Sequence, residues 1–330
     1  SVDPCTGLHE TSCFPCVAPP NRHGLALRVL AISHLYPHAA EKRYGIFVAR
    51  QLAAMASKGA NVSVLVPRSL SSRIGRRGSP LLDIPGVQAQ AVPYLGLPGI
   101  WFKRWAGLWA TIAARGVARR LHQQQPFDVI YGTEVFIGGD VARRLSKELR
   151  SPAACLAIGG DVNVSAKASQ ALGMHFSRVV TGLNGNLACG DEIAAEIDAE
   201  GPRRETLSVY GVVDLDQLSP VNQSTRIDRR EGFGLPADKT ILLYVGYLSQ
   251  KKGLLELIEA FSEVHATHPK TLLVLCGDGS DRSLIQDASN SSPASDAIRF
   301  TGNVDPAEIH RIYQAADVFV LPSYAEGMPN

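Results

Sequence analysis

Residues 240–279 read TILLYVGYLSQKKGLLELIEAFSEVHATHPKTLLVLCGDG. The run TILLYVG is short and apolar, which is typical of a buried strand. Residues 254–265 place apolar side chains at helical spacing, and TLLVLCGDG is a second buried strand that ends in glycines. A strand, a helix and a strand in this order predict a βαβ unit, in which the two strands run parallel.

The same alternation continues through both halves of the chain. The predicted strands of the first half are RVLAIS, NVSVLVP, VQAQAV, FDVIYG and PAACLAIGG, with weaker ones at residues 187–189 and 207–210. Besides TILLYVG and TLLVLCGDG, the second half has the predicted strands IRFTG and DVFVLPS. Helices are expected at residues 45–58 and 306–315, and the polar residues 214–230 are predicted as a linker. We therefore expect an α/β protein with two Rossmann-like lobes, residues 26–218 and 219–330.

The composition excludes several classes of protein. The chain has 330 residues, of which 45% are hydrophobic and 19% charged, and its formal net charge is +2. Such a chain is globular rather than disordered. No apolar run reaches the roughly 18–20 residues that span a bilayer, and the charge is too small to indicate a nucleic-acid partner.

The cysteines fall into two groups. Cys5, Cys13 and Cys16 lie in residues 1–25, which we predict to be an unstructured leader without a signal peptide. A zinc site there would need a histidine as a fourth ligand, which is the alternative interpretation. The remaining cysteines stand singly in apolar runs, which predicts buried thiols in a reducing, cytoplasmic compartment. They are Cys155, Cys189 and Cys276.

Four loops of the second half each follow a predicted strand. They read VGYLSQKKG, CGDGS, FTGNVDP and PSYAEGMPN. Ligands of open α/β sheets bind beyond the carboxyl ends of the strands, and glycine lets backbone approach a ligand closely. Lys252 precedes a predicted helix and could contact a diphosphate. The amides of Gly327 and Met328 could bind the same phosphates.

Several of these blocks resemble the C-terminal lobe of family 4 glycosyltransferases, which have the GT-B fold. The blocks are LLYVGYLSQKKGLLELIEAF, LLVLCGDGS, IRFTGNV and AADVFVLPSYAEGMPN. ISHLYP, YGIFVARQLAAMASKGANVSVLVP, FDVIYGTEVFIGGDVARRL and GGDVNV resemble the acceptor lobe of that family, and VYGVVDLDQLSP resembles its interlobe segment. Within the family, the opening YGIFVARQ is similar to transferases of teichuronic-acid and exopolysaccharide synthesis.

The resemblance implies a donor site in the second lobe and an acceptor site in the first. Lys252 would neutralise the leaving diphosphate, and Glu326 would lie beside the transferred sugar as the first glutamate of a Glu-x7-Glu motif. Asp161 and Asn163 are the acceptor-side candidates. The other donor-binding candidates are Gly45, Gly246, Tyr247, Gly277, Asp278, Gly279, Asn303, Val304, Gly327, Met328 and Pro329.

Three positions depart from the family pattern. Tyr247 stands where the family usually has an arginine that shares the diphosphate with Lys252, and a phenol donates one hydrogen bond but carries no charge. Ile158 and Thr133 replace histidines that line the acceptor side of the cleft in many members. These departures put the acceptor and the rate in doubt.

The resemblance implies a retaining transfer of a sugar from a UDP- or GDP-sugar to a hydroxyl of a saccharide or a lipid-linked acceptor. It implies neither a metal nor another cofactor, since amides, Lys252 and helix N-termini can stabilise the leaving diphosphate. One alternative is a two-lobed subunit that binds nucleotide sugar without catalysis. Another is a nucleotide-sugar epimerase or a sugar phosphorylase of the same fold.

Residues 101–124 are basic and rich in tryptophan. An amphipathic helix of this composition can lie on an anionic membrane surface, so we predict a peripheral contact with the inner face of the membrane. The alternative is a core helix with a solvated basic face.

The chain stops at Asn330, directly after a strand and a loop. We therefore expect the second lobe to be incomplete and the partner of Glu326 to lie beyond residue 330.

Overall fold

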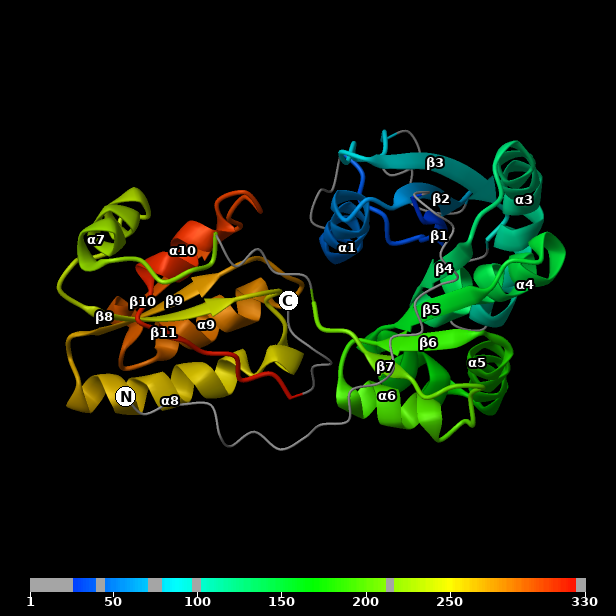
Figure 1. The fold of residues 1–330 in the computed structure, drawn as a ribbon. Coiled ribbons are helices and arrows are strands. Elements are labelled where there is room, and N and C mark those ends of the chain that lie inside the picture. Colours follow the sequence, from blue (N-terminus) through cyan, green and yellow to red (C-terminus); the bar gives the residue numbers. More distant parts are fainter. Residues whose placement is uncertain (1–25, 40–44, 71–78, 97–101, 212–216, 325–330) are drawn as a thin grey trace, which may run out of the picture.

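The computed structural model describes residues 26–39, 45–70, 79–96, 102–211 and 217–324. These residues build two parallel sheets, one in each half of the chain, with helices packed on the faces of each sheet (Figure 1). The two-sheet α/β architecture predicted from the sequence is confirmed.

The first sheet has seven strands in the order β3-β2-β1-β4-β5-β6-β7, and every pairing is parallel. Ile32 of β1 lies opposite Leu65 of β2 and opposite Gly132 of β4. The strands are β1 (Arg28–Ile32), β2 (Asn61–Ser69), β3 (Val87–Tyr94), β4 (Val129–Thr133), β5 (Ala153–Ala157), β6 (Gly185–Ala188) and β7 (Leu207–Ser208).

Both faces of this sheet are covered. Leu30 and Ile32 of β1 belong to one apolar cluster, while the alternating Val29 and Ala31 belong to another, because successive strand side chains point to opposite faces. The helical elements are α1 (Ile46–Ser57), α3 (Lys103–Gln124), η2 (Glu134–Gly139), α4 (Asp140–Leu149), η3 (Gly160–Ser165), η4 (Ala166–Ala168), α5 (Gln170–Gly182) and α6 (Asp191–Asp198).

The second sheet has four strands in the order β10-β9-β8-β11, again all parallel. Its central strand β9 is buried along its whole length, so it contributes to the apolar clusters on both faces. The strands are β8 (Thr240–Val245), β9 (Thr271–Cys276), β10 (Ile298–Gly302) and β11 (Val318–Phe319). The helical elements are α7 (Gln223–Gly232), η5 (Gln250–Lys252), α8 (Leu254–Thr267), α9 (Arg282–Ser291), η6 (Ser295–Ala297) and α10 (Ile309–Ala315).

The predicted linker at residues 214–230 is wrong in its second part, because helix α7 begins there. Asn222 caps this helix by accepting a hydrogen bond of 2.9 Å from the amide of Thr225. Arg230 is buried and donates to Asp317 at 2.6 Å and to the carbonyl of Ala315 at 2.9 Å. The polar residues that suggested a linker thus include Asn222, which caps α7, and the buried Arg230.

Other boundaries shift by a few residues. The helix predicted at 306–315 begins at Ile309, after a turn in which Asp305 accepts a hydrogen bond from the amide of Ala307. The strands predicted at 207–210 and in DVFVLPS are only two residues long. Cys155 and Cys276 are buried as predicted, but Cys189 is only half-buried.

Arg230→Ala should lower the free energy of unfolding of the second lobe by about 1.5–3 kcal/mol, because it removes the closest cation of the Asp317 carboxylate and leaves only Arg226 at 3.0 Å. Hydrogen exchange at the amides of β8 and β11 measures the loss. Arg229→Ala is the matched control, since Arg229 makes a single 3.3 Å hydrogen bond to Gln314, and it should cost less than about 1 kcal/mol. Equal losses in the two variants would contradict the anchoring role of Arg230.

Candidate functional site

Three of the loops singled out in the second half meet at the carboxyl edge of its sheet. The amide of Gly277, after β9, donates to the carbonyl of Gly302 at the end of β10 (2.8 Å). The amide of Gly246, after β8, donates to the carbonyl of Cys276 (3.0 Å). Leu248 donates to the carbonyl of Asp278 (3.1 Å). Backbone hydrogen bonds therefore hold the predicted donor-side loops together.

The glycines of these loops are required by close backbone contact. Gly277 has φ +141°, and a Cβ there would lie 1.9 Å from the carbonyl oxygen of Gly246. A Cβ on Gly279 would lie 2.1 Å from the carbonyl oxygen of Leu248. Any side chain at either position would separate the loops.

Lys252 ends the short helix η5 and is half-buried. Gly253 follows in the left-handed conformation (φ +66°) and begins α8, to which it offers no side-chain cap. The first turn of a helix has amides without intrahelical partners and carries a partial positive charge. Lys252 and the start of α8 thus bring positive charge beside the glycine loops. Glu256 also lies in the first turn of α8, where its carboxylate accepts a hydrogen bond from the Tyr324 hydroxyl.

Tyr247 occupies the position at which the family resemblance leads one to expect an arginine. Its side chain is 57% exposed, and its hydroxyl accepts a hydrogen bond of 3.0 Å from the amide of Ser280. The phenol therefore links the loop after β8 to the loop after β9. Asp278 lies in the loop after β9. Its carboxylate accepts a hydrogen bond from the amide of Gly279 (2.9 Å) and lies 3.6 Å from the guanidinium of Arg282.

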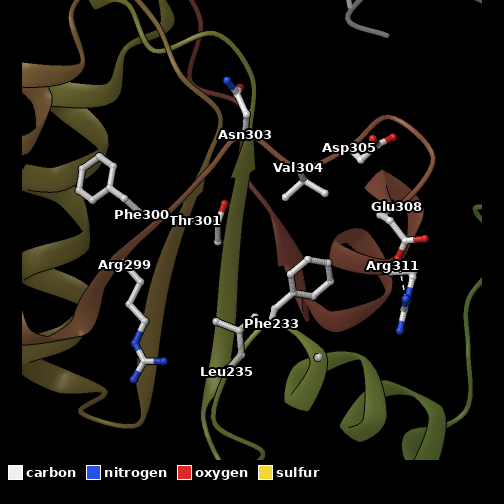
Figure 2. A pocket seen from close by; sticks show the side chains of 11 residues that line it. Phe233, Leu235, Arg299, Phe300, Thr301, Asn303, Val304, Asp305, Glu308 and Arg311 are labelled. Carbon is white, nitrogen blue, oxygen red and sulfur yellow. Dashed lines mark hydrogen bonds and ion pairs between the residues drawn. The ribbon is translucent and has the colours of Figure 1, made fainter. Parts of the chain in front are cut away.

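Asn303 and Val304 line a cavity of about 440 Å³ beside the edge strand β10 (Figure 2). Phe233 enters it from the loop after α7. The other donor-side candidates that the structure describes do not line this cavity. Glu326, Gly327, Met328 and Pro329 lie outside the residues that the structure describes.

In the first lobe, Gly45 begins α1 with φ +69°. A Cβ there would lie 1.4 Å from the carbonyl oxygen of Leu35, so the start of α1 packs directly on the loop that follows β1. No acidic side chain lies in the first turn of α1, which therefore keeps its positive polarisation.

The acceptor-side candidates have different environments. Asp161 is buried, and its carboxylate accepts hydrogen bonds from the amides of Val135 (3.0 Å) and Ile158 (3.2 Å). Burial raises the pKa of Asp161 well above its ordinary value, and the neighbouring Glu134 raises it further. Asn163, two residues along η3, is exposed. Thr133 is buried and donates to Ser33 (2.6 Å).

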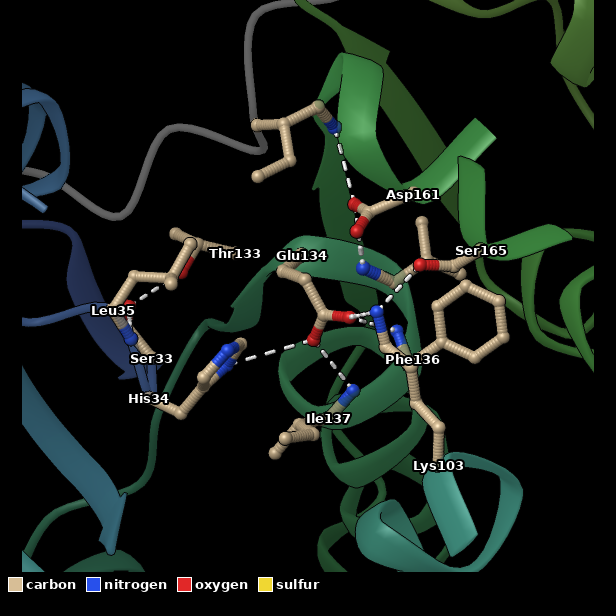
Figure 3. A network of polar contacts seen from close by, with 12 residues as sticks. Ser33, His34, Leu35, Lys103, Thr133, Glu134, Phe136, Ile137, Asp161 and Ser165 are labelled. Carbon is tan, nitrogen blue, oxygen red and sulfur yellow. Dashed lines mark hydrogen bonds and ion pairs between the residues drawn. The ribbon is translucent and has the colours of Figure 1, made fainter. Parts of the chain in front are cut away.

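A polar network that sequence reasoning missed lies at the carboxyl ends of β1 and β4 (Figure 3). The buried Glu134 carboxylate accepts from the amides of Phe136 (3.1 Å) and Ile137 (2.7 Å). It also lies 3.5 Å from Nδ1 of His34 and 3.7 Å from Nζ of Lys103.

Lys103 has further contacts within this network. Its ammonium donates to Ser165 Oγ (2.6 Å) and lies 4.7 Å from the centre of the Phe136 ring. His34, Lys103 and Glu134 come from distant segments and form no motif. One signal was present in the sequence: His34 directly follows the predicted strand RVLAIS, and Glu134 lies two residues after the predicted strand FDVIYG.

Burial lowers the pKa of His34, an effect that Lys103 reinforces and Glu134 opposes. Since the ordinary value is 6.5, His34 is mainly neutral at pH 7.

Within the described ranges, no three His, Cys, Asp or Glu side chains are grouped so that they could hold a metal ion. No helix in the same ranges is long and apolar enough to cross a membrane.

Comparison with known proteins identifies the class of enzyme. Residues 225–330 match the model for glycosyl transferases group 1. The chain is 27% identical to TuaC of Bacillus subtilis, which is named as a teichuronic acid biosynthesis glycosyltransferase, over 92% of this chain and 77% of that protein. The chain is a glycosyltransferase, and the similarity to group 1 lies in its second half.

Solved structures show that this glycosyltransferase has the GT-B fold. Sucrose-phosphate synthase from Thermosynechococcus elongatus superposes with a TM-score of 0.70 at 19% identity and covers 92% of this chain and 77% of that one. Anabaena HepE in complex with UDP gives a TM-score of 0.64 at 15% identity, with 91% of this chain and 75% of that one covered. Both likenesses extend over the two lobes.

Gly277→Ala should destabilise the second lobe by about 1–3 kcal/mol from its backbone conformation alone, and should also separate the loops after β8 and β9. Urea unfolding and hydrogen exchange at residues 246–248 measure the two effects. Gly232→Ala in α7 is the control, because its Cβ would come no closer than 3.8 Å to Arg311. A Gly277→Ala protein as stable as the control would show that the close contact is not required.

Proposed function

We propose that this glycosyltransferase belongs to family 4 and transfers a sugar from a UDP- or GDP-sugar to a hydroxyl, with retention of configuration and without a metal. The main support is the convergence of three glycine loops, Lys252 and the start of α8 at one edge of the second sheet. Such an edge binds anionic ligands through amides and helix termini.

Departure of the nucleoside diphosphate is the difficult step of the transfer. Negative charge then builds on the diphosphate, and preorganised donors that meet it lower the barrier. Lys252 supplies a full positive charge, and the first turn of α8 supplies amide dipoles. In the proposed complex the base lies against Asn303 and Val304, which line the cavity beside β10.

We place the acceptor in the first lobe and expect a saccharide or a lipid-linked acceptor of cell-surface polysaccharide synthesis. The similarity to TuaC, named for teichuronic acid biosynthesis, supports this assignment. So does the fold shared with WaaG, described as a glycosyltransferase involved in lipopolysaccharide biosynthesis. Among the described residues, Cys155, Cys189 and Cys276 form no disulfide, which is consistent with a reducing compartment such as the cytoplasm.

Calorimetry with UDP and with GDP in EDTA tests the donor site. We expect micromolar-to-millimolar binding of one of them without divalent metal. Lys252→Ala should reduce turnover of the nucleotide sugar roughly ten- to hundredfold, since a hydrogen bond to a charged group contributes about 1.5–3 kcal/mol.

Lys251→Ala is the matched control, because the Lys251 side chain is exposed and lies one residue away. It should change turnover less than twofold. An absence of heat with both nucleotides would contradict the donor site, and an unchanged Lys252→Ala protein would contradict the role of that lysine.

The structure gives helix α3 an exposed aromatic face. Its small residues Gly107, Ala110, Ala114 and Ala118 pack inward. The large side chains at helical spacing on the other face are 45–49% exposed; they are Phe102, Trp105, Trp109 and Ile112. This arrangement supports a membrane contact over the alternative of a core helix with a solvated basic face.

Basic side chains accompany this aromatic face. Arg104, Arg115 and Arg120 of α3 are exposed. Aromatic rings favour the membrane interface, and arginines attract anionic lipid headgroups. We propose that α3 docks the protein on the inner face of the membrane, close to lipid-linked acceptors.

The protein should sediment with anionic phosphatidylglycerol vesicles and be released by salt, because the attraction is screened. The double variant Trp105→Gln, Trp109→Gln should sediment far less. Val264→Gln with Leu284→Gln removes two similarly exposed apolar side chains from the second lobe and should behave as wild type. Equal recovery in the supernatant with and without vesicles would contradict the docking proposal.

A further inference from the structure

The order of strands places a switch point between β1 and β4. From β1 the chain crosses through α1 to β2 on one side, and from β4 it crosses through α4 to β5 on the other. At such a point the crossover connections diverge and leave a crevice at the carboxyl ends of the two strands. His34 lies two residues after β1, and Glu134 directly follows β4.

The backbone of Glu134 is unusual. Among the non-glycine residues that the structure describes, positive φ angles occur only at Glu134 (+70°) and Arg150 (+55°). Arg150 ends helix α4, where a left-handed residue is common. Glu134 instead begins a helix, and strained residues of this kind persist where the surroundings hold them. Its conformation turns the carboxylate inward toward His34 and Lys103 (Figure 3).

The Glu134 carboxylate orients the His34 ring. Nδ1 of His34 is buried, has no hydrogen-bond partner and lies 3.5 Å from Glu134 Oε2. The side chain is nevertheless 23% exposed, and this exposure lies on side-chain atoms other than the buried Nδ1. A proton on Nδ1 is favoured by the adjacent carboxylate, which leaves Nε2 as a hydrogen-bond acceptor.

The charges of this cluster balance. Lys103 is paired with Glu134, and both His34 and Asp161 are shifted toward their neutral forms. A cluster without net charge suits a neutral hydroxyl better than a phosphate or a carboxylate.

We propose that His34, oriented by Glu134, accepts the hydrogen bond of the attacking hydroxyl and holds its oxygen toward the donor sugar. The inference rests on the proposed function, because it assigns to the first lobe the hydroxyl that the second lobe's donor would glycosylate. It also gives the chain a polar acceptor-side group although Ile158 and Thr133 stand where many family members have histidines.

The test uses water as the acceptor, since water occupies the same place when a nucleotide sugar is hydrolysed. Release of UDP from UDP-glucose, or of GDP from GDP-mannose, is followed without any added acceptor. His34→Asn should lower this rate at least tenfold, while its affinity for UDP or GDP by calorimetry stays within twofold of wild type. His268→Asn, which changes an exposed histidine beyond α8, should alter neither quantity.

Two further readouts separate hydroxyl binding from a structural role. Glu134→Gln should also lower the hydrolysis rate while retaining nucleotide affinity. Thermal melting checks that His34→Asn and Glu134→Gln are both folded. In the wild type, hydrolysis should fall in acid as His34, which faces Glu134 and Lys103, takes up a proton. Because burial lowers the pKa of His34, this fall should come at a lower pH than for an ordinary histidine. This acid limb should be missing in His34→Asn.

The outcomes distinguish the two proposals. Nucleotide binding by the wild type with unchanged hydrolysis in folded His34→Asn would overturn the role of His34 and leave the donor site intact. A wild-type protein that binds neither UDP nor GDP would overturn the proposed function itself.

Discussion

The burial of both faces of two parallel sheets is the constraint on which the rest of this structure depends. A strand such as β9, with every residue buried, offers no side chain to a ligand along its length. Functional groups must therefore lie where the strands end. Because all pairings in each sheet are parallel, the ends that carry the ligand-binding loops fall on one edge.

Close approach of backbone segments shapes that edge in both lobes. Gly45 packs on the loop after β1, Gly277 packs on the loop after β8, and Gly253 packs on the loop after β11. Each of these glycines has positive φ, so the conformation and the lack of space both exclude a side chain. The same contacts bring the starts of α1 and α8 to the edge, where their amide dipoles can act on an anionic ligand.

The two lobes offer different chemistry at equivalent places. In the second lobe, Lys252 and a helix start form a positive corner that suits a diphosphate. In the first lobe, Lys103 is neutralised by Glu134, and the remaining polar group, His34, is a neutral acceptor of hydrogen bonds. This division fits one anionic substrate and one neutral substrate, which is what a sugar transfer from a nucleotide requires.

Local patterns were sufficient to predict most of the fold. The apolar run predicted as a strand at the start of the second sheet is β8, and the helical spacing after Lys252 is α8. Prediction failed where long-range contacts decide the outcome. Helix α7 looked like a linker because its buried anchor Arg230 is recognisable only beside Asp317.

In the candidate site, too, the local patterns could be recognised in the sequence and the long-range contacts could not. The glycine loops are contiguous in sequence and could be recognised, whereas the Glu134 network joins residues about 30 to 100 positions apart in the chain and has no local signature. The exposed tryptophans of α3 could not be placed either, since the inward face of that helix is set by small residues that fit against the sheet.

The configuration of the sugar at the moment of transfer tests the account most directly. Proton NMR of the protein with UDP-glucose or GDP-mannose in EDTA would follow the anomeric signal of the first product formed, before mutarotation. The account predicts release or transfer of the sugar with the anomeric configuration of the donor and without divalent metal. A product of inverted configuration, or turnover only after metal is added, would contradict it.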